Sequence, residues 1–378
     1  MIRQTTLLAT LLVILPAAAA AGLLPAQEQV RRGASNELLI DDKLRDSVAR
    51  AHDWLAREQA PEGHWAQLVG YKLNNGYELQ DEQPLPHVGV TALALMSYLA
   101  GGHLPDRGKY GKVLERGIDY VLGCAQDDGQ ITQNGTRMYS HAFATLFLAE
   151  VYGMIDRADV KRVLQRSVDL IVSSQNAEGG WRYKPFARES DMSITVCQVL
   201  ALRAARNVGI FVPVTTIKNA QNYVYRSAVR SNDRTYNSWG AAYGDFGGSF
   251  RYQNREPTRA TFPLTAAGVT TLYAAGEYDS PIIRDALDWM DRELVRFSND
   301  NVGHYFFFYG HYYAVQAYYV TGDPKWTSYF KKTKALLLET QERDGRWRCH
   351  TGPGDAFGTA VASLVLQIPL QYLPIFQR

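Results

Sequence analysis

A turn motif that recurs along the chain constrains its fold more than any other feature. The pattern Gln-x-x-x-Gly-x-Trp occurs three times, from Gln59 to Trp65, from Gln175 to Trp181 and from Gln341 to Trp347. Each copy follows an amphipathic segment and precedes a more apolar one. A unit that recurs at the same point of successive segments is typical of repeat architectures.

Degenerate turns at Gly129, Gly247-Gly248 and Gly303 extend the repeat to six pairs of helices. Apolar residues at three-and-four spacing predict the first helix of each pair at residues 44–59, 110–126, 160–175, 214–229, 282–297 and 326–341. The second helices are predicted at 87–100, 141–152, from 191, from 261, at 309–320 and from 355 to the end.

The two helices of a pair differ in polarity. The first is amphipathic and has one wet face, whereas the second is apolar nearly all round, as a helix buried on all sides should be. Six outer and six inner helices in alternation predict an all-α fold, an α6/α6 toroid. An open solenoid is the alternative, but the chain shows no obvious polar capping repeats.

The turn motif has a mechanical interpretation. Glycine permits a sharp turn with positive φ after the outer helix. The glutamine amide can bond exposed backbone groups at a neighbouring helix end, and the indole can cover the turn with a large apolar area. We therefore expect structural roles for Gln59, Trp65, Gln175, Trp181, Gln341 and Trp347.

The N-terminus has the pattern of a targeting segment. Arg3 precedes an apolar run from Leu7 to Leu15, and an alanine run suits cleavage near Ala20 or after Ala26. Residues 1–26 are thus predicted to be a signal peptide of an exported protein, periplasmic or secreted. The alternative is an uncleaved anchor, with association at the membrane surface. Residues 27–39 are predicted to be a flexible lead-in, and 40–378 a single toroid domain.

The charge balance argues against a nucleic-acid-binding protein, and the cysteine count argues against a fold held by a disulfide framework. Lys+Arg 40 against Asp+Glu 38 leaves no excess basic charge, so a nucleic-acid partner is not expected. Three cysteines permit at most one internal disulfide, so packing must hold the fold. Cys197, in an apolar helix, is predicted to be a small buried residue.

Repeated turns of this kind in an all-helical chain resemble those of the terpenoid cyclase and protein prenyltransferase superfamily, which includes the squalene-hopene cyclases. The resemblance covers about residues 40–378. It implies the α/α toroid fold and a long isoprenoid chain, or another hydrophobic small molecule, bound in the apolar barrel interior.

The family motifs are only partly present. The acid motif of squalene-hopene-type cyclases is Asp-x-Asp-Asp-Thr, and Asp191 and Thr195 match its ends. Ser193 and Ile194 stand where the second and third aspartates belong, and the second is the proton donor in such enzymes. The Asp-x-Cys pair of the prenyltransferase zinc site is absent, and the segment from Cys349 to Asp355 fits no zinc pattern. No metal or cofactor is predicted.

Aligning the inner helices on a shared threonine places polar residues at one end of the barrel. His87, His141, Asp191 and Asp355 each precede a threonine by four residues, one helical turn on the same face. These four are the candidate catalytic residues, able to bind a polar head group or to move a proton. Helix capping is the alternative, favoured for the two aspartates.

The fifth inner helix carries a dense group of rings. These rings could line a substrate pocket and stabilise carbocations through their π faces, or pack as an ordinary core. The candidate substrate-binding residues are Tyr305, Phe308, Tyr309, His311 and Tyr312.

Three functions are compatible with these features. The first is an exported isoprenoid-binding or terpenoid-cyclase-like protein. The second is a secreted polysaccharide-active enzyme, because barrels of paired helices also host such chemistry. The third is a non-catalytic protein-interaction scaffold. A deep dry pocket favours the first, a wide polar groove the second and a filled barrel the third.

Overall fold

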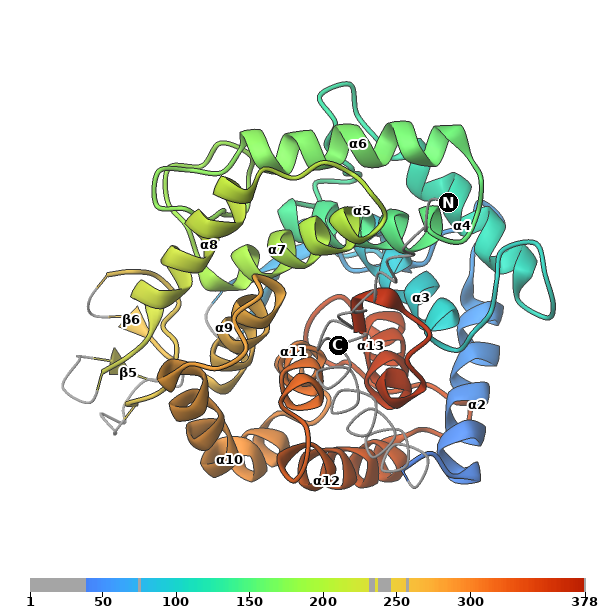
Figure 1. Ribbon diagram of the computed structural model, residues 1–378. Coiled ribbons are helices and arrows are strands. Elements are labelled where there is room, and N and C mark those ends of the chain that lie inside the picture. Colours follow the sequence, from blue (N-terminus) through green and yellow to red (C-terminus); the bar gives the residue numbers. More distant parts are fainter. Residues whose placement is uncertain (1–38, 74–75, 231–234, 237–245, 256–257, 377–378) are drawn as a thin grey trace, which may run out of the picture.

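The computed structural model of the protein describes residues 39–73, 76–230, 235–236, 246–255 and 258–376. The predicted signal peptide and nearly all of the predicted lead-in lie outside these residues. Within them, the chain forms twelve α-helices that alternate between an outer and an inner ring (Figure 1). The outer helices are α2 (Asp42–Glu58), α4 (Gly111–Gly123), α6 (Ala158–Ser173), α8 (Val214–Ser227), α10 (Pro281–Asn301) and α12 (Lys325–Thr340). The inner helices are α3 (Val88–Ala100), α5 (Met138–Tyr152), α7 (Met192–Asn207), α9 (Phe262–Ala274), α11 (Tyr305–Thr321) and α13 (Asp355–Gln367).

The inner ring is closed. Each inner helix packs against the next, from α3 through α5, α7, α9 and α11 to α13, and α13 packs back against α3. In the outer ring, the last helix, α12, contacts the first, α2. The predicted α/α toroid is confirmed, and the open solenoid is excluded.

Burial follows the polarity of the two helix classes. Every residue of α3 is buried, whereas α2 buries one face that includes Leu44, Val48 and Leu55. No described helix is both long enough and apolar enough to cross a membrane.

The three complete turn motifs hold neighbouring repeats together. The glutamine Nε2 donates to the carbonyl oxygen of its own turn glycine and to a carbonyl of the next outer helix, as Gln175 does to Gly179 (2.9 Å) and Thr216 (2.8 Å). The indole Nε1 of Trp181 donates to the carbonyl of Ile171 at 2.8 Å. The other two turns repeat both sets of bonds: Gln59, Trp65, Gln341 and Trp347. These bonds attach each turn to the next outer helix, which is consistent with the structural role expected from the sequence.

The shared threonine also has a structural role. Its Oγ1 accepts the backbone N–H of the turn aromatic in four repeats, as Thr195 does from Trp181 at 3.3 Å. The same bond joins Trp65 to Thr91, Phe250 to Thr265 and Trp347 to Thr359. Each outer-to-inner turn is thereby attached to the first turn of its inner helix.

The turn glycine is required for two reasons. Gly179 has φ +88°, and a Cβ there would lie 2.4 Å from the carbonyl oxygen of Asn219 in α8. Gly63 and Gly345 have the same conformation and meet the next outer helix in the same way. Glycine therefore sets both the turn and the distance between repeats.

Several predicted boundaries are wrong, including the end of α10, which lies at Asn301 rather than at 297. Helix α11 begins at Tyr305 rather than near 309, because His304 caps it by accepting the N–H of Phe306 at 3.0 Å. Helix α5 begins at Met138, so His141 lies in its first turn. Helix α13 was predicted to reach the end of the chain, but it ends at Gln367. A 3-10 turn that contains Pro369 follows it.

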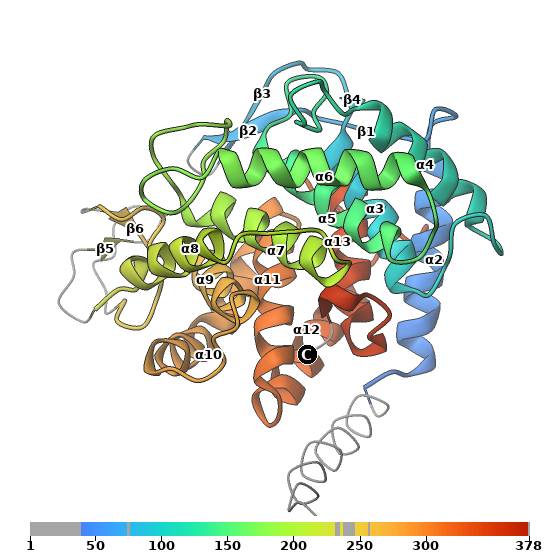
Figure 2. The same ribbon diagram turned by 45° about the horizontal axis from the view of Figure 1, so that its top comes forward.

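Short strands were missed by the sequence analysis. β1 (Ala66–Gln67) pairs with β4 (Leu85–Pro86), and β2 (Gly70–Leu73) pairs with β3 (Gly76–Leu79), both antiparallel. β5 (Thr235–Tyr236) and β6 (Thr258–Arg259) form a parallel pair. Figure 2 shows the first four at the top of the ring.

The C-terminal segment lies at the end of the barrel opposite to strands β1–β4. The 3-10 turns Ile368–Leu370 and Pro374–Phe376 contact α11 and α7, and Figure 1 shows this end of the chain inside the ring. The N–H of Ile375 donates to Glu150 Oε1 at 3.2 Å. Burial raises the pKa of Glu150 to about 8.

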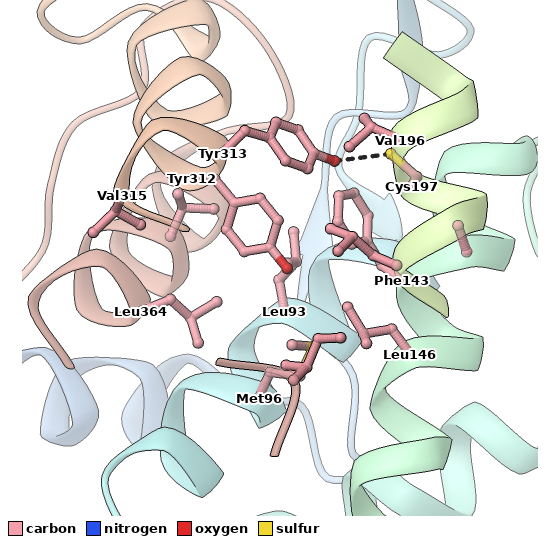
Figure 3. Close-up of a cluster of buried hydrophobic side chains, with 14 of the residues drawn as sticks. Leu93, Met96, Phe143, Leu146, Val196, Cys197, Tyr312, Tyr313, Val315 and Leu364 are labelled. Atoms are coloured by element: carbon pink, nitrogen blue, oxygen red, sulfur yellow. Dashed lines mark hydrogen bonds between the residues drawn. The ribbon is translucent and has the colours of Figure 1, made fainter. Parts of the chain in front are cut away.

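Between the two ends the barrel is filled by side chains (Figure 3). Leu93, Phe143 and Tyr312 meet in its centre, and the hydroxyl of Tyr313 lies 2.9 Å from Cys197 Sγ. All three cysteines of the chain are buried and free, so Cys197 is the small core residue expected.

Candidate functional site

A cavity of about 180 Å³ lies at the end of the barrel where the inner helices begin. Its wall includes the first turns of α3, α5, α9 and α11, together with α13, and Val69, Tyr71 and Tyr77 of the β2–β3 region. The lining is mainly apolar and aromatic, and eight of its residues are tyrosines: Tyr71, Tyr77, Tyr139, Tyr183, Tyr252, Tyr305, Tyr309 and Tyr312. None of the described lining residues is Asp or Glu.

Two arginines contribute the positive charge of the cavity wall. The guanidinium of Arg137 lies 4.3 Å from the centroid of the Tyr71 ring and 6.0 Å from that of Tyr183. The guanidinium of Arg259 lies 4.2 Å from the Tyr252 ring. Such cation–π contacts hold a guanidinium in place without neutralising its charge.

A hydrogen-bond chain leads from the cavity wall to a buried carboxyl group. The hydroxyls of Tyr183 and Tyr252 are 2.6 Å apart, and the Tyr252 hydroxyl donates to Asp191 Oδ2 at 3.3 Å. Asp191 Oδ1 accepts from Ser193 Oγ (2.6 Å) and from the N–H of Ile194 (2.9 Å). Because Asp191 is fully buried, desolvation raises its pKa, and these bonds oppose that rise.

Two lining hydroxyls have no partner in the described structure. The hydroxyls of Tyr305 and Tyr312 are buried and make no hydrogen bond. Burial raises the pKa of both groups, so both stay protonated at neutral pH. A buried unpaired hydroxyl is costly, and a ligand polar atom in the cavity would satisfy it.

The four candidate catalytic residues do not all lie at the cavity. His87 is the N-cap of α3, accepting the N–H of Val90 at Nδ1 (3.3 Å), and it lines the cavity. His141 points into the turn, where its Nδ1 accepts the N–H of Ile131 at 3.0 Å. Burial lowers the pKa of each to about 4, so both rings are neutral at pH 7.

The two aspartates also differ. Asp191 caps α7 and is not itself a described lining residue, but it accepts hydrogen bonds from two residues that are, Tyr252 (3.3 Å) and Ser193 (2.6 Å). Asp355 lies outside the lining, where Oδ1 accepts the N–H of Cys349 (2.9 Å) and Oδ2 lies 3.3 Å from Arg348 Nη1. The structure therefore brings His87 and Asp191 to the cavity region but directs His141 and Asp355 into turns.

Of the five candidate substrate-binding residues, three line the cavity and two do not. Tyr305, Tyr309 and Tyr312 line the cavity, and their contact with a ligand stays a prediction. Phe308 is buried next to Phe357 and does not line it. His311 faces the outer ring, with Nδ1 2.8 Å from the Tyr329 hydroxyl and Nε2 3.1 Å from Ser298 Oγ.

Sequence reasoning missed the residues that shape the polar part of the cavity. Tyr183 and Tyr252 each follow the turn aromatic by two positions, after Trp181 and Phe250. This shared position in the repeat is the sequence feature that could have predicted that the two tyrosines lie together. Arg137 precedes α5, and nothing in its local sequence separates it from an ordinary surface arginine.

Among the described residues, no group of three or more His, Cys, Asp or Glu side chains could hold a metal ion. The site is defined instead by aromatic rings, two guanidiniums and unpaired hydroxyls. The protein is thus an α/α toroid with an aromatic cavity at the inner-helix N-termini.

Comparisons with known proteins support the fold. No protein-family model and no curated protein matches the sequence. Among solved structures, the type II terpene cyclase MstE from Scytonema is 15% identical with a TM-score of 0.58, and the match covers 88% of this chain and 99% of that chain. A further MstE structure contains geranylgeranyl dihydroxybenzoate as substrate.

The GH76A α-1,6-mannanase from Salegentibacter sp. HEL1_6 is 8% identical with a TM-score of 0.60, covering 87% of this chain and 99% of that chain. A protein from Actinoplanes is 14% identical with a TM-score of 0.56 and coverage of 87% and 99%. Identities this low establish the toroid fold alone, which hosts both terpenoid and glycan chemistry. The resemblance to squalene-hopene cyclases in particular stays a prediction.

Proposed function

We propose that this chain is a terpenoid-cyclase-like toroid that binds a hydrophobic, isoprenoid-type small molecule in the aromatic cavity. The observation that carries the proposal is the lining itself. Rings such as Tyr309 and aliphatic side chains such as Val90 and Leu264 surround a space inside the barrel. Burial of an apolar chain against these surfaces supplies the driving force for binding.

The glycan alternative has less support from the cavity. Hydrolysis of a glycosidic bond ordinarily uses two carboxyl groups that flank the bond. The described lining residues include no Asp or Glu, and Asp191 is fully buried behind Tyr252. The scaffold alternative is disfavoured because side chains leave this end of the barrel open as a cavity.

The same arrangement favours binding over alkene protonation. Protonating an alkene requires a strong acid in contact with the double bond. A phenol is a weak acid, and Asp191 is fully buried and is not among the described residues that line the cavity. The proposed activity is therefore ligand binding, with the π faces available to any cationic group of the ligand.

A matched pair of substitutions tests the location of binding. Val90 is buried and lines the cavity, whereas Val214 is 55% exposed. Val90→Phe adds a ring inside the cavity, and Val214→Phe makes the same change outside it. We expect Val90→Phe to weaken farnesol binding by about tenfold or more, as an obstructed pocket requires, and Val214→Phe to leave it unchanged.

Calorimetric titration with farnesol supplies the affinities, and thermal unfolding verifies that both variants fold. If Val90→Phe does not fold, Val361→Phe repeats the test from α13. Equal affinities of a folded cavity variant and Val214→Phe would refute binding in this cavity.

Export also belongs to the proposal. The apolar run from Leu7 to Leu15, followed by small residues, supports a cleaved signal peptide, with an uncleaved anchor and membrane-surface association as the alternative. The intact mass of the protein recovered from an expressing cell distinguishes the two, because cleavage after Ala20 or Ala26 removes a defined segment.

A further inference from the structure

The two arginines of the cavity wall lack a carboxylate partner. In the described structure, neither Arg137 nor Arg259 takes part in an ion pair. Other arginines behave differently, as Arg182 pairs with Glu189 and Arg157 with Asp119. A guanidinium that is partly buried without a carboxylate keeps its full charge in a medium that screens charge poorly.

Both guanidiniums act on the same group of tyrosines. Arg137 lies 6.0 Å from the Tyr183 ring, and Arg259 lies 4.2 Å from the Tyr252 ring. The hydroxyls of these two tyrosines are 2.6 Å apart. The positive charge of Arg259 also opposes the rise in the pKa of Tyr183 and of Tyr305. The two cations therefore flank one hydrogen-bonded tyrosine pair at the cavity wall.

Asp191, the buried carboxylate of this region, does not pair with either arginine. Asp191 is fully buried, and its oxygens accept from Ser193, Ile194 and Tyr252 rather than from a guanidinium. The Tyr305 hydroxyl, also in the cavity lining, is buried and has no hydrogen-bond partner among the described residues. Arg137 occupies the N-cap position of α5, and its guanidinium, held against the Tyr71 ring at 4.3 Å, belongs to the cavity lining.

We propose that Arg137 and Arg259, with the Tyr305 hydroxyl, form a subsite for the anionic head group of an amphiphilic ligand, a carboxylate or a phosphate. The apolar part of that ligand occupies the aromatic cavity, so this inference rests on the proposed function. Guanidiniums bind carboxylate and phosphate oxygens through paired N–H donors, and the charge attraction adds to these bonds. The N-terminus of α5 adds a favourable dipole.

Three ligands that share one apolar chain test the head group. Farnesol is neutral, farnesoic acid supplies a carboxylate and farnesyl monophosphate supplies a phosphate. We expect at least one anionic ligand to bind about tenfold or more tightly than farnesol. The stronger of the two anions identifies the head group.

Charge-removing variants test the residues. We expect Arg137→Gln and Arg259→Gln each to weaken binding of the anionic ligand about tenfold while changing farnesol binding less than about twofold. Arg255→Gln is the matched control, because Arg255 is exposed on the same segment as Arg259 and does not line the cavity. The control should bind all three ligands as the parent protein does.

The outcomes separate the two proposals. Equal binding of farnesol and both anions, unaffected by the arginine variants, overturns the anion subsite and leaves the apolar cavity intact. If no farnesyl compound binds, phenyl phosphate decides: binding that depends on Arg137 and Arg259 supports the subsite and refutes the isoprenoid ligand. Failure of phenyl phosphate as well overturns both.

Discussion

Substitution of the turn glycine Gly179 by alanine is expected to destabilise the toroid well beyond the cost of an unfavourable backbone conformation. Gly179 has φ +88°, and a Cβ there would lie 2.4 Å from the carbonyl oxygen of Asn219. Gly276 provides a matched control, because it has φ +91° and no heavy atom within 4 Å of the added Cβ.

The difference between the two variants measures the contact between repeats. Both pay about 1–2 kcal/mol for a side chain in the left-handed region. Only Gly179→Ala also forces apart the turn and α8, a strain that costs about 1–3 kcal/mol in a packed interior. We therefore expect a loss in the free energy of unfolding of about 2–5 kcal/mol for Gly179→Ala and about 1–2 kcal/mol for Gly276→Ala.

Urea unfolding followed by circular dichroism and by tryptophan fluorescence gives both values, and coincident transitions establish that one free energy describes each variant. Equal losses for the two alanines would refute the claim that turn glycines set the distance between repeats.

Two further predictions follow from the same structure. Trp181→Phe removes the indole bond to the Ile171 carbonyl (2.8 Å) and should cost about 1–3 kcal/mol; an unchanged urea midpoint would show that this bond does not stabilise the turn. Glu150 has a pKa raised to about 8 by burial, so between its unfolded value near 4.5 and pH 8 the folded state holds a proton that the unfolded state has lost. Stability from this group therefore falls as pH rises, by about 2 kcal/mol between pH 6.5 and 8, and Glu150→Gln should abolish that fall; a variant with the parent's pH profile would contradict the assignment.

The fold could be predicted because the repeat signals act locally. The glutamine, glycine and tryptophan of each turn bond to backbone groups that the motif itself implies, as Gln175 does to Gly179. The polarity difference between paired helices then leaves one closed arrangement. The missed start of α11 has a local cause too, because capping by His304 through Nδ1 is not a common helix-start signal.

The cavity was harder to predict because its wall is assembled from segments far apart in the sequence. Tyr183 and Tyr252 meet across 69 positions, and the strand residues Tyr71 and Tyr77 lie in a connection that the helical pattern treated as a turn. His311, in contrast, was predicted to bind the substrate but does not line the cavity. It lies in an aromatic run, but helical geometry points it at Tyr329 in the outer ring instead of at the cavity.

The central claim, that the aromatic cavity at the inner-helix N-termini holds an apolar ligand, is tested most directly by photoaffinity labelling. The protein is irradiated with a farnesyl analogue that carries a benzophenone, and the labelled peptides are sequenced by mass spectrometry with and without excess farnesol. We expect competed labelling within residues 87–93, 137–143 and 305–312, the parts of α3, α5 and α11 that line the cavity. Competed labelling confined to the outer helices, or labelling that farnesol does not displace, would contradict the account.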